Sequence, residues 1–382
     1  MNFDLTDEQT MLKETLTRLL TESYDFEKRG RALALPEGWS AEMWNRFVEM
    51  GLTSLPFENA DGGLGGGPVE TMIVMEALGS ALTLEPFFST VVLGGGFVRL
   101  GGNAHQRAAI VPLIGDGSLK LAFAHGERDA RYDLHHVETV ATRKDDGFAI
   151  SGIKENVLHG DSADLLIVTA RTSGAARDDN GIGVFVVDAH ASGVTRRGFV
   201  MQDGIRAAEI TFDSVEVTAD AVLGDPGNGL PLVRQVVHLA LAALCAEAVG
   251  VLSSMTQLAV DYLKMRKQFG VPIATFQALQ HKAVDMFIAV EQARSITLYA
   301  TTLAENGDQR LRAAAVHAAK TEIGRAARLV GEAAIQLHGG LGMTMDCAVG
   351  RYFKRAAMID LTFGDADYHL EALAALGGLE DA

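Results

Sequence analysis

The stretch YLKMRKQFGVPI, residues 262–273, lies between two long segments with helical periodicity and decides the predicted fold. Glycine and proline end helices, so Gly270-Val271-Pro272 is expected to form a turn. Three long helices are predicted around it, at 231–269, 274–306 and 309–338, and a shorter helix follows. Helices of about 30 residues span about 45 Å and are typical of an antiparallel bundle or an oligomer interface. We therefore predict a C-terminal four-helix bundle in residues 229–382.

Two other patterns precede this bundle. Residues 120–228 contain short runs rich in Val, Ile, Phe and Thr, separated by Gly and Asp turns such as 145–147. This pattern is typical of a small antiparallel β-sandwich or barrel. Residues 1–119 have helical periodicity and open with a capping box at Thr6 and Gln9. The predicted fold class is therefore α+β, with an N-terminal helical domain, a middle β domain and the C-terminal four-helix bundle.

Composition narrows the class of protein. The chain has 382 residues, of which 48 % are hydrophobic and 21 % charged, as in a globular protein of two or three domains. Its formal net charge of −16 disfavours binding to nucleic acid or to anionic membranes. Cys245 and Cys347 lack metal-ligand spacing, and so few cysteines suit a reducing compartment. Because the first residues also lack the pattern of a signal peptide, we expect a cytoplasmic protein.

Glu247 is the most informative single residue. It is the only carboxylate between Arg234 and Asp261, within an apolar run too interrupted for a membrane span and better interpreted as a buried helix. Burial favours the neutral form of a carboxylate and suits it to act as a general base near neutral pH. The alternative is that Glu247 pairs with an Arg or Lys from another helix, which is equally compatible with burial.

Two runs at the predicted helix ends are further candidates, because the motifs of P-loop, Rossmann, zinc-protease and serine-hydrolase sites are absent. The basic residues around Arg266 suit a helix C-terminus, but an Arg beside a glycine turn also suits a phosphate. In the run QLHGGLGMT, residues 336–344, one glycine would serve as a helix cap. Three glycines in four positions exceed that need and would let the backbone approach a flat or phosphorylated ligand.

Taken together, these two runs resemble the acyl-CoA dehydrogenase family. The family pattern R-x-x-F-G-x-x-I-x-x-F/H-Q is similar to this chain at Arg266, Phe269, Gly270, Ile273, Phe276 and Gln277. The pattern Q-x-x-G-G-x-G is similar to Gln336, Gly339, Gly340 and Gly342. The opening run 3–9 and Gly152-Ile153-Lys154 are also similar to the family, so the resemblance covers the whole chain.

The resemblance implies FAD as the cofactor, held between the β domain and the C-terminal helices and completed by a neighbouring subunit. It implies that Arg266, Phe269, Ile273 and Gln277 contact the FAD of the adjacent subunit. Gln336 and Gly340 would contact its adenosine and pyrophosphate. Ala124 and His125, and then Asn156 and Leu158, occupy the stretches that flank the flavin. The family often has Thr, and Trp with Thr, in these two stretches, so the side-chain contacts to the flavin differ in this chain.

The resemblance also implies a reaction and a base. The family removes a proton and a hydride from an acyl-CoA thioester and passes electrons to an electron-transfer flavoprotein, usually as a tetramer. Its two usual base positions correspond to Phe363 and Ala240 in this chain. Glu247 lies two helical turns after Ala240 on the same face and is the predicted base, with Asp365 as the second candidate.

Three other functions stay open at this point. The chain could be a non-catalytic or site-sharing subunit of a heterotetramer with a homologous chain. It could be an acyl-CoA oxidase, which passes electrons to oxygen, or a helical scaffold without flavin. The sequence leaves the acyl chain of the substrate undefined.

Overall fold

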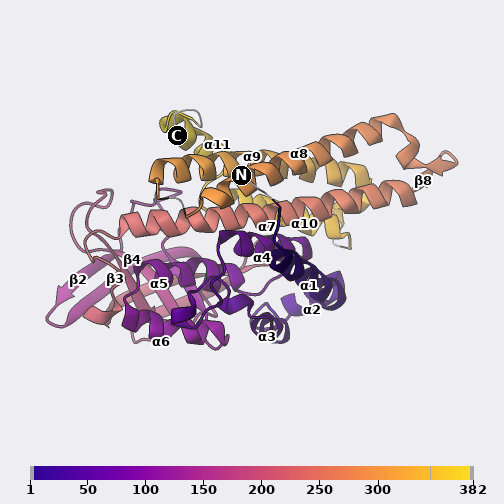
Figure 1. Ribbon diagram of the computed structural model, residues 1–382. Helices are drawn as coiled ribbons and strands as arrows, with labels where there is room; N and C mark the ends of the chain where they lie inside the picture. The colour runs from indigo at the N-terminus through magenta and orange to yellow at the C-terminus, as the bar shows by residue number, and fades with distance from the viewer. Residues whose placement is uncertain (1–3, 306, 345, 379–382) are drawn as a thin grey trace. The chain divides into compact units, whose positions relative to one another are not determined.

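The computed structural model describes residues 4–305, 307–344 and 346–378 (Figure 1). Phe3 and Asn306, which the sequence patterns include, lie outside the described residues. The chain forms two compact units. The helical unit comprises Met1–Arg31, Pro68–Thr83 and Leu241–Ala382, and the sheet unit comprises Ala32–Gly67 and Leu84–Ala240. The domain boundaries near 119 and 228 stay a prediction.

The sheet unit is built on one seven-stranded sheet. Its strands are β1 (Leu121–Ala124), β2 (Val140–Lys144), β3 (Gly147–Leu158), β4 (Leu165–Arg171), β5 (Ile182–Asp188), β6 (Val194–Val200) and β7 (Arg206–Thr218). The order is β1-β4-β2-β3-β7-β6, and β5 pairs with β4. The predicted β domain is confirmed, but its sheet is mixed, because β1 and β4 run parallel. The intervening β2–β3 hairpin gives the chain the length that a parallel connection needs.

Helices complete the sheet unit. They are α3 (Ala41–Glu49), η1 (Leu52–Ser54), η2 (Asn59–Asp61), η3 (Phe88–Gly94), α5 (Gly95–Gly101), α6 (Ala104–Gly115) and η4 (Ala219–Ala221). Gly94 lies directly against Leu121 of β1, where a side chain would collide with the leucine. This close approach packs η3 against the strand that leads to Ala124 and His125.

The helical unit contains the long helices predicted from periodicity. Its elements are α1 (Asp7–Ser23), α4 (Pro68–Ala81), β8 (Lys267–Gln268), β9 (Val271–Pro272), η5 (Ile273–Thr275), α8 (Gln277–Leu303), α9 (Gln309–His338), η6 (Gly339–Met343), α10 (Ala348–Leu361) and α11 (Ala366–Ala375). Two helices, α2 (Phe26–Leu33) and α7 (Leu230–Met265), contribute residues to both units. Figure 1 shows α8 and α9 side by side. The predicted capping box of α1 is confirmed, since Thr6 and Gln9 exchange hydrogen bonds.

The helix α7 ends at Met265, four residues before the predicted end. The chain turns at Phe269 and Gly270, which both have positive φ, and pairs β8 with β9 in a two-residue hairpin. By length and composition α7 could span a membrane, but 89 % of its most apolar window is buried inside the protein. The expectation of a buried core helix is therefore confirmed.

Two glycines let α4 and α7 approach each other closely. A side chain at Gly79 would overlap the backbone carbonyl of Glu247, and one at Gly250 would overlap that of Glu76. Helices can touch backbone to backbone only where such side chains are missing. This contact fixes the position of Glu247 along α7 relative to α4.

Candidate active site

Glu247 is buried and pairs with Arg355 of α10. Glu247 is 7 % exposed, and Arg355 is 8 % exposed. Arg355 donates from Nε to Oε1 of Glu247 at 2.6 Å and from Nη2 to Oε2 at 2.8 Å. The ion pair to another helix, which the sequence left open beside the role of a base, is therefore present. The two hydrogen bonds from the arginine hold the carboxylate in one plane.

The other base positions contain no free carboxylate aligned for the same role. Ala240 is fully buried, and Phe363 has a positive φ of 56° just before α11. Asp365 is the N-cap of α11, because its Oδ1 accepts a hydrogen bond from the backbone N–H of Tyr368 at 2.9 Å. Asp365 thus has a structural task, and the base role of Glu247 stays a prediction.

The two sequence motifs meet at the ends of α7 and α9. Tyr262 stacks on His338 with ring centroids 4.5 Å apart and planes 24° apart. This contact places the last turn of α7 beside the end of α9, and in the glycine turn that follows α9 a Cβ at Gly340 would meet nothing within 4 Å. Gln336 is exposed and lines a groove of about 530 Å³ between α8 and α9. The glycine turn therefore leaves room for a ligand.

The hairpin presents an unusual exposed aromatic side chain. Phe269 is 91 % exposed although it adopts a φ of 54°, which is strained for a residue of this size. Its only described ring contact is an edge contact with Phe276 at 6.1 Å. Arg266 and Gln277 are also exposed, and Ile273 is half-buried. These side chains make few contacts within the chain and are available to another molecule.

In the sheet unit, the predicted residues lie at the ends of β1 and β3. Ala124 is fully buried and pairs with Val168 of β4. Leu158, the last residue of β3, is half-buried and pairs with Ala207 of β7. Asn156 has a φ of 55° where the β3–β7 register shifts, which marks a bulge. Bulges often redirect strands next to active sites.

His125 follows Ala124 and is held on two sides. Its ring stacks on Phe123 with centroids 5.2 Å apart, and Nδ1 lies 2.9 Å from the Thr169 hydroxyl. Burial, followed by the nearby charge of Lys154, lowers the pKa of His125 to about 3. The imidazole is therefore neutral at physiological pH.

A buried ion pair between Lys154 and Glu127, which the sequence analysis did not predict, lies next to His125. Lys154 Nζ donates to Glu127 Oε1 at 2.6 Å, and both residues are buried. Burial lowers the pKa of Lys154 to about 8. Burial alone would raise the pKa of Glu127, but Lys154 and hydrogen bonds from Glu138 and Thr139 lower it. No local signal in the sequence marks this pair, because Lys154 stands between Ile153 and Glu155 and its partner Glu127 is 27 residues away.

The same glutamate belongs to a cluster with metal-ligand atoms. Atoms of Glu127, His136 and Glu138 lie within 4.8 Å of one another. Glu127 Oε1 already accepts from Lys154 and from the Thr139 hydroxyl at 2.7 Å. The lysine ammonium beside it repels a second cation, so the ion pair accounts for this cluster.

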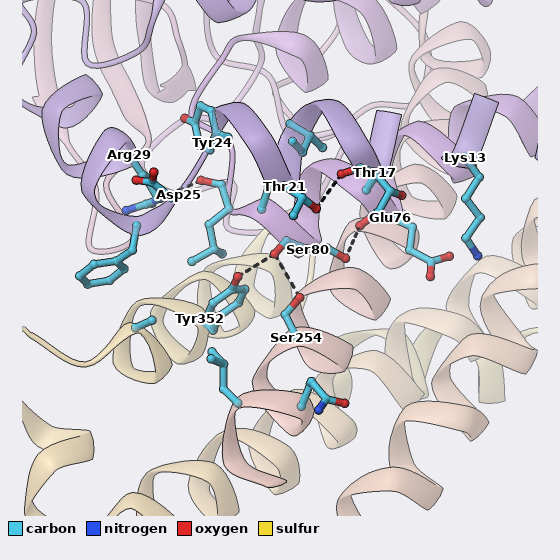
Figure 2. A pocket seen from close by; sticks show the side chains of 18 of the residues that line it. Lys13, Thr17, Thr21, Tyr24, Asp25, Arg29, Glu76, Ser80, Ser254 and Tyr352 are labelled. Atoms are coloured by element: carbon cyan, nitrogen blue, oxygen red, sulfur yellow. Dashed lines mark hydrogen bonds between the residues drawn. The ribbon is translucent and has the colours of Figure 1, made fainter. Parts of the chain in front are cut away.

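A second cavity lies within the helical unit. It has a volume of about 480 Å³ and is lined by residues of α1, α2, α4, α7 and α10. Figure 2 shows Tyr352 and Ser254 pointing at Ser80, whose backbone oxygen accepts hydrogen bonds from their hydroxyls at 2.6 and 3.1 Å. None of the site residues predicted from the sequence lines this cavity.

Comparisons with known proteins assign the chain to a family. Three family models match consecutive segments: the N-terminal domain of acyl-CoA dehydrogenases at residues 6–118, the middle domain at 122–215 and the C-terminal domain at 227–376. The chain belongs to the acyl-CoA dehydrogenase family. Members of this family are FAD-dependent oxidoreductases that act on CH–CH groups, and the predicted fold class and enzyme class are thereby confirmed.

Individual relatives match nearly end to end. The probable acyl-CoA dehydrogenase YngJ of Bacillus subtilis is 28 % identical over 96 % of this chain and 97 % of its own length. The short-chain specific acyl-CoA dehydrogenase of Megasphaera elsdenii is 29 % identical, covering 97 % and 98 %. A solved structure of a variant of the Tcur3481-Tcur3483 steroid ACAD has a TM-score of 0.88 and 28 % identity, and covers 97 % of both chains.

The described residues fit the FAD that the family binds. The glycine backbone at Gly340 is open, and the hairpin exposes Phe269. His125 has a buried ring nitrogen, Nε2, without a hydrogen-bond partner among the described residues. Such an atom is expected where a polar ligand belongs. At Asn156 and Leu158, by contrast, the chain lacks the family's common flavin-contacting side chains.

Proposed function

We propose that this chain catalyses the α,β-dehydrogenation of an acyl-CoA thioester to the trans-2-enoyl-CoA, and that an electron-transfer flavoprotein takes the electrons. Membership of the acyl-CoA dehydrogenase family supports the reaction class. The observation that carries the proposal is the buried carboxylate of Glu247, held in place by two hydrogen bonds from Arg355. We place the reaction in the cytoplasm.

Glu247 is the proposed base. Its carboxylate accepts two hydrogen bonds from Arg355, which fix its plane and its orientation. A carboxylate has about four lone-pair sites, so two hydrogen bonds from Arg355 leave acceptor capacity. In the proposed step Glu247 takes the proton from the α-carbon, and the β-carbon loses a hydride as the double bond forms. The chemistry that FAD supplies when bound is acceptance of that hydride.

The cofactor would be held by two groups of residues. Ala124, His125 and Leu158 would flank the flavin, while Gln336 and Gly340 would face the adenosine and pyrophosphate. Arg266, Phe269, Ile273 and Gln277 would reach the FAD of a neighbouring subunit. A tetramer, either of identical chains or with a homologous subunit, is therefore part of the proposal. Exposed apolar side chains on the hairpin and α8 support this assembly: Phe269, Val271, Phe276, Val284, Phe287 and Ile288.

The test is anaerobic bleaching of the purified flavoprotein with a panel of monocarboxylyl-, dicarboxylyl- and steroid-CoA thioesters. We expect at least one thioester to bleach the flavin and to yield the enoyl-CoA. Rapid peroxide formation on admitting air would instead indicate an acyl-CoA oxidase. A colourless protein that FAD does not reconstitute would contradict the proposal and favour a scaffold.

A second candidate function is a site-sharing subunit of a heterotetramer. The replacements at Asn156 and Leu158 favour it, because these positions lack the side chains with which the family commonly contacts the flavin. The sequence resembles the small subunit of a pimeloyl-CoA dehydrogenase, and the similar steroid ACAD structure carries two chain names in its title. Co-purification of a second homologous chain, with flavin bleaching only in the complex, would establish this function.

A further inference from the structure

The side chain of His125 is held in place, but only one of its two ring nitrogens has a hydrogen-bond partner among the described residues. It is 6 % exposed, stacked on Phe123, and held through Nδ1 by Thr169. Its other nitrogen, Nε2, has no hydrogen-bond partner among the described residues. Buried polar atoms in native proteins are normally paired with protein, water or ligand. This atom therefore points to a ligand.

The surrounding hydrogen bonds determine which nitrogen carries the proton. Lys154 Nζ lies 3.2 Å from the Thr169 hydroxyl and, as an ammonium, can only donate to it. The single hydroxyl proton of Thr169 is then left for another acceptor, and the acceptor within reach is Nδ1 of His125 at 2.9 Å. When Thr169 donates this proton to Nδ1, the one proton of the neutral imidazole lies on Nε2. The unpaired atom is thus an N–H donor.

The donor is fixed by a chain of charged and polar groups. Glu127 anchors Lys154 at 2.6 Å, and Lys154 also donates to the backbone oxygen of His125 at 3.2 Å. Glu127 in turn accepts from the backbone N–H and the hydroxyl of Thr139 at 3.0 and 2.7 Å. The pair Lys154–Glu127 is neutral overall, so the donor faces its ligand without a net charge beside it. A metal ion is disfavoured, because the available nitrogen is protonated.

We propose that His125 donates its Nε2–H to a ring acceptor, a carbonyl oxygen or imine nitrogen, of the bound isoalloxazine. This rests on the FAD binding in the proposed function and goes beyond it, because it assigns a donor, a tautomer and the residues that fix it. Ala124, directly before it in β1, has no donor in its side chain, so His125 supplies the polar contact at the end of this strand. His125 is a binding residue, and Thr169 and Lys154 are positioning residues.

The first experiment measures the tautomer in FAD-free protein with ¹⁵N-labelled histidine. We expect NMR to find the His125 proton on Nε2, with Nδ1 as acceptor. Thr169→Val, which removes the hydroxyl donor, should abolish this preference. A proton on Nδ1 in the unmodified chain would overturn the inference and leave the proposed function intact.

The second experiment compares FAD binding of the unmodified chain and His125→Phe. Phenylalanine keeps the ring that stacks on Phe123 and loses only the N–H. Loss of one hydrogen bond should raise the Kd for FAD about tenfold and shift the visible flavin spectrum, as read by flavin fluorescence and absorbance. His105→Phe, the same replacement at an exposed position of α6, should change neither.

The outcomes separate the two proposals. Equal FAD affinity and an identical spectrum in His125→Phe would overturn the donor role while FAD binding stands. If the unmodified chain binds no FAD, both proposals fall together. If His125→Phe does not fold, the tautomer measurement on the unmodified chain decides whether Nε2 is a donor.

Discussion

Arg355 on α10 clamps Glu247 on α7 with two parallel hydrogen bonds, although 108 residues separate them in the chain. Both partners are buried, and their opposite charges compensate each other. The pair joins two helices of the same unit and fixes the orientation of the candidate base. Substitutions at these two positions can separate the contribution of the pair to protein stability from its contribution to catalysis.

Removing one partner of the pair should destabilise the protein strongly. Glu247→Gln leaves a buried guanidinium without its carboxylate and should lower the free energy of unfolding by about 3–5 kcal/mol. The double variant Glu247→Gln/Arg355→Gln removes both charges and should recover much of that loss. Urea unfolding curves of both variants test this. Equal stability of Glu247→Gln and the unmodified chain would show that the ion pair is dispensable.

The same variants test whether Glu247 is the catalytic base. The double variant keeps the shape of the site and has no ionisable group at position 247, so acyl-CoA should no longer bleach bound FAD. Arg355→Gln alone keeps the carboxylate but removes the side chain that orients it, so flavin reduction should be slower than in the unmodified chain and faster than in the double variant. Stopped-flow absorbance under anaerobic conditions gives both rates. Normal bleaching in the double variant would exclude Glu247 as base, and Asp365→Asn would then be the next variant to measure.

Acid should destabilise the helical unit through His317. Burial lowers the pKa of His317 to about 4, and its Nδ1 lies 2.7 Å from Nδ1 of His369. Below the ordinary value of 6.5 the unfolded chain binds a proton that the folded chain refuses, so stability falls as the pH drops from 6.5 towards 4. His317→Gln should make the urea midpoint less dependent on pH in this window. An unchanged pH dependence would contradict the assignment.

We expect Phe269 in the hairpin to contribute to oligomer formation and to lower the stability of the single chain. Asn tolerates positive φ and is preferred before Gly in this turn type, so Phe269→Asn should relieve backbone strain. Thermal stability of the chain should stay equal or rise, while oligomer formation and FAD retention fall. Light scattering after gel filtration and the flavin-to-protein ratio measure these effects. An intact flavin-loaded oligomer would show that Phe269 is not at the interface.

Close packing of α4 on α7 predicts that Gly250 tolerates no side chain. In Gly250→Ala the new methyl group would overlap the carbonyl of Glu76, and overpacking of this kind costs about 1–3 kcal/mol. Gly340→Ala is the matched control, because nothing lies within 4 Å of its Cβ. The control should unfold like the unmodified chain and bind FAD more weakly. Chemical denaturation with parallel FAD titration distinguishes the two glycines.

Local signals in the sequence were sufficient for the elements and the family. Periodicity identified the long helices, the capping box at Thr6 was correct, and the runs at 262–273 and 336–344 led to the acyl-CoA dehydrogenase family. The end of α7 was misplaced because Phe269 takes a positive φ that no periodicity reveals. The parallel pairing of β1 with β4 was missed because strand order depends on contacts between distant segments.

The sequence alone therefore determined which segments are helices and strands, and that a single carboxylate lies in the apolar part of α7. These properties depend on neighbours a few residues apart, which the period of a helix or strand encodes. Only the tertiary structure decided that Arg355 is the partner of Glu247 and that Thr169 and Lys154 orient His125. Such partnerships depend on the packing of elements far apart in the chain, and Coulomb and hydrogen-bond energies change steeply over an ångström or two.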